Sequence, residues 1–284
     1  LKLQLRGSSS KSPIALGFAS RVPSWQAMGS RCCTEAGGQS IEGVDTEGKP
    51  LSKSVLIPAQ GAVYTGEWVD KLRHGHGEQV WPDGAKYKGQ WVKDKAQGVG
   101  RFEHIEGDVY EGEWVEDKAD GKGIYKHMDG SQYEGTWKLD KQDGQGTETF
   151  QDSSRFEGQY VNGLKSGRGM FAWVDGSSYE GNFEQNAIQG HGSYVWADGR
   201  KYEGQWVTNR MHGQGRFEWS DGRVYEGGYV NDVKEGEGKF WWPDNKKYEG
   251  QWKGGKQHGT GSYTSKGETR QGEWADGKRI SWNS

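Results

Sequence analysis

Three residues near the start of the chain could accept fatty acids. The chain opens with Leu1, and its first methionine, Met28, is followed directly by Gly29. If translation starts at Met28, Gly29 stands where N-myristoylation requires a glycine, and Cys32 and Cys33 follow as palmitoylation candidates. One myristoyl chain binds a membrane only marginally, whereas two acyl chains hold a protein there stably. This stretch therefore predicts a lipid-tethered protein.

Two other interpretations of the same segment stay open. Residues 1–27 contain no Asp or Glu, four basic residues and six serines, a composition typical of a transit peptide. The third interpretation is an unstructured tail with two inert thiols. Cys33 also stands at the sixth position of the myristoylation motif, where Ser or Thr is preferred.

The other polar side chains form no recognisable catalytic or metal-binding pattern. His74, His212 and His258 are too far apart in sequence for a local zinc site, which needs three or four clustered ligands. The Gly-x-Gly pairs precede expected strands, whereas phosphate-binding glycine loops lead into a helix. We therefore expect a protein that is not an enzyme and that uses no cofactor or metal.

The composition limits the function classes further. Net charge is −3, so the chain has no basic field for nucleic acid. No apolar run approaches the length of a transmembrane helix. The two cysteines are adjacent, which excludes a disulfide framework and favours a reducing compartment. Only 31% of residues are hydrophobic, yet there are 15 Trp and 13 Tyr, so aromatic rings must supply the core.

A 23-residue repeat accounts for these rings. Its nine full copies start at an aromatic residue, which we number position 0. Position 2 is Gly and position 4 is aromatic in every copy, and positions 11 and 13 are always Gly. Position 15 is aromatic in seven copies and position 17 in six. A tenth, incomplete copy starts at Arg270.

This spacing predicts β-hairpins with one aromatic face. Positions 0, 2 and 4 share a face of an extended strand, and the glycine between the rings leaves room for a ring over bare backbone. The rings of this predicted aromatic face are Tyr64 and Trp68, Tyr87 and Trp91, Tyr110 and Trp114, Tyr133 and Trp137, Phe156 and Tyr160, Tyr179 and Phe183, Tyr202 and Trp206, Tyr225 and Tyr229, and Tyr248 and Trp252.

Two connections join the strands of successive hairpins. Positions 19 and 20 read Asp-Gly in five copies, for example Asp175-Gly176. This dipeptide predicts a tight turn between strands, because both residues tolerate positive φ. Positions 5–10 are polar and variable, and we expect them to make contacts specific to each repeat.

The pattern Tyr-Glu-Gly-x-Trp, a polar loop, Gly-x-Gly and then Asp-Gly resembles the MORN repeat (membrane occupation and recognition nexus). The resemblance covers residues 64 to about 276. Strand spacing and twist predict an all-β fold, an elongated, twisted, single-sheet antiparallel meander of nine to ten 23-residue hairpins, and the resemblance implies the same meander. Residues 1–63 are expected to be largely disordered, with a strand near Val55, and residues 277–284 to form a tail.

The resemblance also implies non-catalytic roles in scaffolding, dimerisation, and attachment to membranes or cytoskeletal structures. We expect a scaffold tethered to the cytoplasmic face of a membrane. Two interpretations of its aromatic face stay open: the rings pack internally, or they meet an apolar helix or extended segment of a protein partner, or phospholipid. The alternative is a structural subunit of a cytoskeletal or axonemal assembly, or of an organelle, without membrane attachment. A homodimer is a further expectation.

Overall fold

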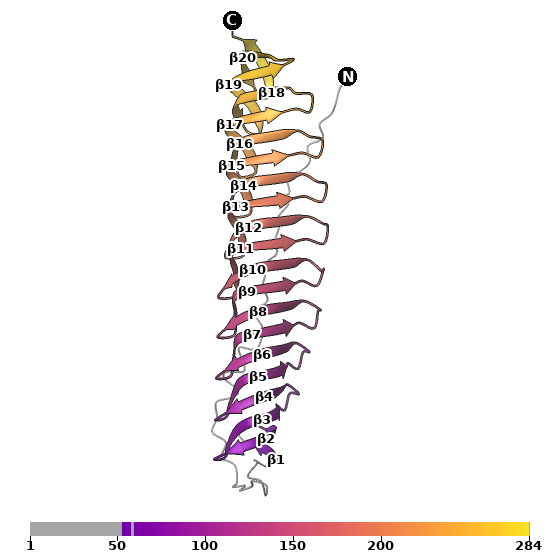
Figure 1. Ribbon diagram of the computed structural model, residues 1–284, viewed down its shortest axis with the longest axis vertical. Helices are drawn as coiled ribbons and strands as arrows, with labels where there is room; N and C mark the ends of the chain where they lie inside the picture. Colours follow the sequence, from indigo (N-terminus) through magenta and orange to yellow (C-terminus); the bar gives the residue numbers. More distant parts are fainter. Residues whose placement is uncertain (1–52, 58–59, 284) are drawn as a thin grey trace. The chain divides into compact units, whose positions relative to one another are not determined.

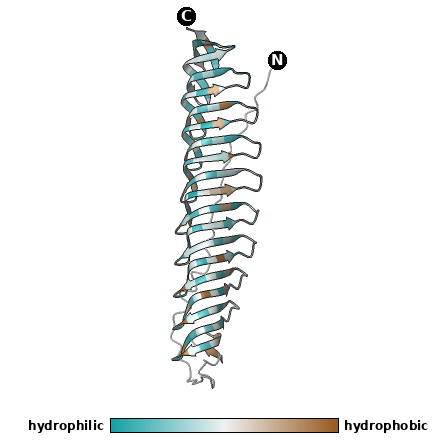
Figure 2. Cartoon of the chain, in the orientation of Figure 1, coloured by the Kyte–Doolittle hydropathy of each residue, from teal (hydrophilic) through white to brown (hydrophobic). Residues whose placement is uncertain are grey.

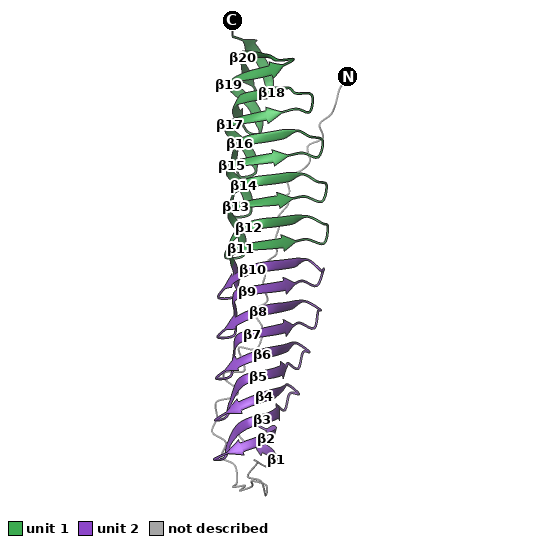
Figure 3. Cartoon of the chain, viewed as in Figure 1, with its two compact units in different colours: residues 1–19, 166–284 green, residues 20–165 purple. Residues whose placement is uncertain are grey.

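The computed structural model describes residues 53–57 and 60–283. The acylation candidates Gly29, Cys32 and Cys33 lie outside this part of the chain. Within it, no helix is long and apolar enough to cross a membrane. The chain divides into an N-terminal unit, which ends at Lys165, and a C-terminal unit, whose described part starts at Ser166 (Figure 3).

Strands joined by short turns make up both units (Figure 1). The strands of the N-terminal unit are β1 (Lys53–Ile57), β2 (Ala62–Val69), β3 (Leu72–Val80), β4 (Lys86–Val92), β5 (Lys95–Glu103), β6 (Val109–Val115), β7 (Lys118–Lys126), β8 (Gln132–Lys138), β9 (Lys141–Thr149) and β10 (Arg155–Val161). β11 (Leu164–Ala172) contains the boundary between the units. The C-terminal unit continues with β12 (Ser178–Glu184), β13 (Ala187–Val195), β14 (Lys201–Val207), β15 (Arg210–Glu218), β16 (Val224–Val230), β17 (Val233–Trp241), β18 (Lys247–Lys253), β19 (Lys256–Ser265), β20 (Glu268–Ala275) and β21 (Lys278–Trp282).

Successive strands pair antiparallel within each unit. In the β6–β7 pair, Gly112 faces Gly123, and the register then shifts so that Trp114 faces Ala119. The same facing glycines and the same shift recur in β12–β13, β14–β15, β16–β17 and β18–β19. The prediction of an all-β antiparallel meander of 23-residue hairpins is confirmed, and the strand predicted near Val55 is β1.

The core consists of rings that lie over glycine backbone. Most of each strand carries a hydrophilic or neutral colour in Figure 2, and the large buried side chains are chiefly Tyr, Trp and Phe. Tyr110 meets Trp114 of its own repeat and Trp137 of the next edge-on, with centroids 5.1 and 5.4 Å apart. Edge-to-face pairs of this kind are favourable for aromatic rings. Because position 0 contacts position 4 of two repeats, these rings join neighbouring hairpins.

Hydrogen bonds fix both rings of the core pair. The hydroxyl of Tyr110 donates to the carbonyl of Glu113 at 3.0 Å, at the register shift. The indole N–H of Trp114 donates to the carbonyl of Gly100 at 3.0 Å. A buried hydroxyl or indole N–H without an acceptor would be costly, so these bonds let Tyr and Trp serve where a soluble protein usually places aliphatic residues.

Both connections are short turns, and they differ in type. Between positions 5 and 8, Thr208 and Asn209 both have positive φ and join Val207 to its partner Arg210, which makes this the tight two-residue hairpin turn. At the Asp-Gly connection only the glycine, such as Gly176, has positive φ. The predicted turn is therefore present, with positive φ at its glycine alone.

The physical reason lies in how the Asp-Gly connection is closed. The backbone N–H of Gly176 donates to the carbonyl of Trp173, and the N–H of Trp173 donates to the carbonyl of Ser177. The carboxylate of Asp175 accepts the N–H of Ser177 at 2.8 Å, an arrangement that Asp favours without a left-handed backbone.

The close contact at Gly123 provides a direct test of ring-over-glycine packing. A Cβ atom added there would lie 2.5 Å from Cε2 and Cζ of Tyr110, and neither this buried ring nor the strand backbone can move away freely. We expect Gly123→Ala to lower the free energy of unfolding by about 3 kcal/mol through overpacking, measured by chemical denaturation. The control is Gly130→Ala, which meets open space at a φ of +88° and should cost about 1 kcal/mol. Equal losses for both variants would contradict the packing argument.

Candidate interaction surface

The predicted aromatic face is almost entirely core. Of its rings, Trp68 is half-buried. The others are buried, from Tyr64 at 0% exposed to Trp252 at 7%. These positions therefore hold the repeats together, and the rings open to a partner must be sought elsewhere in the repeat.

Position 17 supplies partly exposed rings in the C-terminal unit. We call Trp173, Trp196, Trp219 and Trp242 the tryptophan row; all four are half-buried. They directly follow β11, β13, β15 and β17, and each starts the turn into the next strand. In Figure 1 these turns follow one another along one edge of the C-terminal unit. The sequence shows position 17 to be aromatic, but it gives no sign that these rings differ in exposure from the others.

Acidic and basic side chains flank the row in the same turns. Asp198 pairs with Arg200 at 2.7 Å, and Asp221 pairs with Arg223 at 2.8 Å. The hydrogen bonds from these guanidinium groups lower the pKa of both carboxyls. Lys246 pairs with Asp244 in the last of these turns at 2.6 Å. The pairs are exposed and contribute little to stability, but they leave the surface beside the row nearly neutral.

The N-terminal unit has a different set of side chains at position 17. Trp81 is buried there, while His127 lies 3.2 Å from the carboxylate of Asp108. Tyr125 donates its hydroxyl to the same carboxylate at 2.7 Å. Burial opposes ionisation of Asp108, but the hydrogen bonds from Tyr125 and from the backbone N–H of Met128 outweigh it and lower the pKa of the carboxyl.

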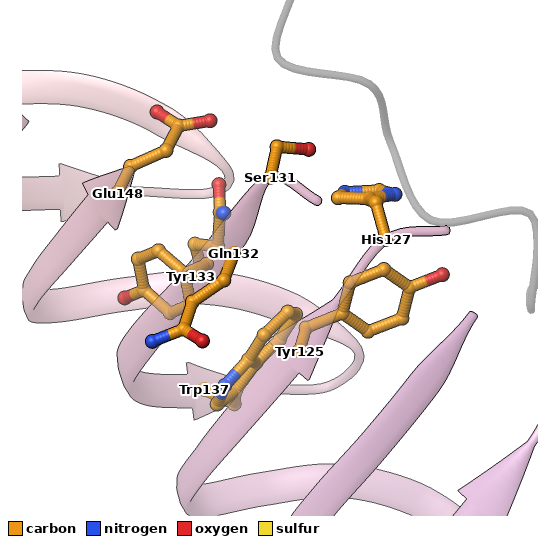
Figure 4. A pocket seen from close by; sticks show the side chains of 8 residues that line it. Tyr125, His127, Ser131, Gln132, Tyr133, Trp137 and Glu148 are labelled. Carbon is orange, nitrogen blue, oxygen red and sulfur yellow. The ribbon is translucent and has the colours of Figure 1, made fainter. Parts of the chain in front are cut away.

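Figure 4 shows the small pocket beside this cluster, with Tyr125, His127, Tyr133, Trp137 and Glu148 around it. The space inside it for a water molecule is about 10 Å³, which is about one water position. A pocket of this size does not hold a substrate. In the described part of the chain, no three His, Cys, Asp or Glu side chains gather closely enough to hold a metal ion.

A buried ion pair lies further along the N-terminal unit. The amine of Lys165 is 2.5 Å from Oε2 of Glu148, which also accepts the hydroxyl of Tyr160 at 3.0 Å. The Lys165 side chain is 1% exposed and that of Glu148 is 13% exposed. Burial lowers the pKa of Lys165, and the charge of Glu148 opposes that change. This pair holds strands together and does not face solvent.

A repeating contact missed by the sequence interpretation links neighbouring hairpins. The carboxylate of Asp232, at position 7, accepts the backbone N–H of Met211 in the preceding repeat at 2.8 Å. Asn209 accepts the N–H of Ile188 in the same way at 2.7 Å. The expectation that positions 5–10 carry contacts specific to each repeat is wrong at position 7. The recurrence of Asp or Asn there was the signal that could have revealed this ladder.

Lys234 is the other lysine placed among rings. Its amine lies 4.5 Å from the centroid of Trp219 and 5.0 Å from those of Phe240 and Trp252. Burial, and then repulsion from Arg223, lowers the pKa of this amine to about 8. The rings favour the charged amine, so they offset part of the burial cost.

The low pKa of Lys234 makes stability depend on pH. Below pH 8 both the folded and unfolded chains bind the proton, and the burial penalty is at its maximum. Between pH 8 and 10.5 only the unfolded chain keeps the proton, so this lysine makes stability rise with pH. We expect Lys234→Met, which copies Met211 of the preceding repeat, to stabilise the chain by about 1–3 kcal/mol at pH 7. The gain over wild type should shrink by pH 9.5 in denaturation experiments, and a gain that is constant with pH would contradict this account.

Stacked hairpins with a ring core define a class of β-hairpin repeat protein. The chain belongs to the MORN-repeat family, whose repeat model matches nine consecutive segments, residues 64–86, 87–109, 110–132, 133–155, 156–178, 179–199, 202–222, 225–247 and 248–270. The family match supports a non-catalytic interaction protein. No curated protein matches the chain.

The chain is also similar to several solved structures. The TCP10 domain of Danio rerio CPAP is 13% identical, with a TM-score of 0.40 over 70% of this chain and 94% of that one. The G-box domain of the microcephaly protein CPAP is 13% identical, with a TM-score of 0.33 over 71% and 100%. The Drosophila melanogaster SAS-4 TCP domain, solved with a proline-rich motif of Ana2, is 9% identical, with a TM-score of 0.27 over 74% and 93%. With TM-scores below 0.5, these likenesses carry no argument about the function of this chain.

Proposed function

We propose that this protein is a non-catalytic scaffold that binds a protein partner along the tryptophan row and is tethered to a membrane by acylation of Gly29, Cys32 and Cys33. The partial exposure of the tryptophan row supports the proposal that the protein binds a partner. Half-buried rings aligned on one edge offer a partner more contact area than the fully buried rings of positions 0 and 4. Aromatic residues are enriched at the centres of protein interfaces.

Protection of the row in native complexes tests the partner-binding half. Hydroxyl-radical footprinting would compare the full chain in complexes from its source with the isolated chain. We expect Trp196 and Trp219 to be oxidised several-fold more slowly in the complexes. Trp241 lies on the strand face opposite the row and serves as the internal control, whose oxidation should be unchanged. Equal oxidation of the row in both samples would end the proposal for this surface.

The tether has its own test, because it rests on residues outside the described part of the chain. Mass spectrometry of the mature N-terminus should find a myristoylated Gly29, and Gly29→Ala should move the protein from the membrane to the soluble fraction. A peptide that starts within residues 1–27, or beyond Cys33, would contradict acylation. The protein would then fit the alternative, a structural subunit of a cytoskeletal or axonemal assembly. Phospholipid binding by the repeats and homodimerisation stay predictions.

A further inference from the structure

We infer that the tryptophan row binds a proline-rich segment in the polyproline II conformation, running across the strand ends of the C-terminal unit. The inference rests on the proposed partner-binding function and names the class of partner. Five properties of the row carry it: its period, the rings that link it, its unpaired donors, its fixed backbone and its charge.

The period of the row matches a polyproline helix. Each repeat adds two strands spaced about 4.8 Å apart, so equivalent residues recur about every 9.6 Å. A polyproline II helix has three residues per turn and rises about 9.3 Å per turn. A proline-rich segment laid along the row would therefore present the same face to each successive tryptophan. An α-helix, with a pitch of about 5.4 Å, has no such match.

Buried rings between the tryptophans pack them into one continuous row. One buried position-15 ring bridges each pair, with successive centroids 4.4 to 5.6 Å apart. The chain of rings runs through Trp173, Tyr194, Trp196, Phe217, Trp219, Phe240 and Trp242. Aromatic-lined tracks are what proline-rich segments dock on, since the pyrrolidine rings pack flat against them.

The indole N–H groups of the row are free to donate. Five buried position-4 tryptophans give their N–H to a glycine carbonyl, as Trp206 does to Gly192 at 3.1 Å. Within residues 166–283, the four indoles of the row have no such acceptor, and they are not shut off from solvent. Polyproline carbonyls are fully solvated because the helix has no internal hydrogen bonds. A row of donors at the matching period therefore complements them.

The backbone of every row tryptophan is held by its turn. The N–H of Trp196 donates to the carbonyl of Arg200, and the carbonyl of Trp196 accepts the N–H of Gly199, both at 2.9 Å. The same two bonds close the turns at Trp173, Trp219 and Trp242. Binding then costs little ordering of the receptor, and a polyproline segment is itself preorganised.

Charge favours an uncharged occupant. The Asp198–Arg200 and Asp221–Arg223 pairs neutralise themselves within their turns, as does Asp244 with Lys246. The carboxylate of Asp175 in the first turn and the amine of Lys234, 4.5 Å from the centroid of Trp219, have opposite signs. The row therefore carries little net charge that would attract a strongly acidic or basic peptide, or an anionic membrane. Proline-rich segments need no charge to bind.

The test uses the full chain and synthetic peptides. Binding of acetylated decaproline, tetraproline, a Gly-Ser decapeptide and a helical Ala-rich peptide would be followed by calorimetry and by the indole ¹H–¹⁵N resonances of the protein. Three repeat intervals span about 29 Å, and ten polyproline residues span about 31 Å. We expect saturable decaproline binding, at least tenfold weaker binding of tetraproline, and shifts of the row indoles.

Matched variants locate the site. Trp196→His with Trp219→His copies His104 and His127, the residues at this position in the second and third repeats, and should weaken decaproline binding at least tenfold. Trp241→Val copies Val195, the equivalent residue two repeats earlier, on the strand face opposite the row. This variant should leave binding unchanged. The inference fails if decaproline does not saturate at millimolar concentration, if the double variant binds equally, or if the helical peptide binds the row more tightly. Footprint protection in native complexes would still support the proposed function in that case, so the two failures are distinguishable.

Discussion

Replacement of Glu148 by glutamine is expected to lower the free energy of unfolding by about 3–5 kcal/mol. The change keeps the size of the side chain but removes the charge that faces the buried amine of Lys165 at 2.5 Å. An ammonium group left in the core without its counter-charge must either stay desolvated or lose its proton, and both are unfavourable. Guanidinium denaturation followed by tryptophan fluorescence would measure the loss.

A double variant separates this effect from general damage to the core. Glu148→Phe with Lys165→Ile copies Phe171 and Ile188, the equivalent residues one repeat further on. Well-packed apolar replacements of buried ion pairs are often neutral or stabilising, so the double variant should recover wild-type stability or exceed it. A loss below 1 kcal/mol in Glu148→Gln would show that the buried amine of Lys165 does not need the charge of Glu148.

Trp114→Ala is the second change with a large expected effect, also about 3–5 kcal/mol. The side chain is 1% exposed. It meets Tyr87 of the preceding repeat at 5.2 Å and Tyr110 of its own at 5.1 Å. Removal of the indole opens a cavity between two repeats and leaves the carbonyl of Gly100 without its donor. Because the ring contacts both hairpins, the loss should spread to the neighbouring repeat.

Hydrogen exchange would show that spread, with faster exchange in β4–β7 than at the far end of the N-terminal unit. The matched control is Trp114→Tyr, since Tyr160 and Tyr229 fill position 4 in other repeats. This variant should retain most of the stability. A loss below 1 kcal/mol for Trp114→Ala would mean that the ring contributes little to the contact between repeats.

The sequence predicted the hairpins and their core faces because both depend on local periodicity. An alternating strand places every second residue on one face, and nine copies of a 23-residue period repeat the same pattern. The need for glycine at position 2 also followed, since a Cβ atom added at Gly112 would lie 2.6 Å from the hydroxyl of Tyr110. The packing of the same ring over Gly123, at position 13, did not follow. The turn types did not follow. Asp-Gly predicted a tight turn, but it did not show that only the glycine takes positive φ, nor that the side chain of Asp175 accepts the N–H of Ser177.

The sequence by itself therefore determined the fold class, the length of the repeat and the residues of the core, because these need only a strand of period two and a fixed register. Only the tertiary structure decided which rings stay open to solvent. Tyr110 and Trp114 are buried between neighbouring repeats. Trp196 and Trp219 lie at strand ends, where no further strand covers them. It also decided that Lys165 meets Glu148, because that contact joins residues from two successive repeats. Exposure and pairing depend on neighbours distant in sequence, and a single repeat does not contain them.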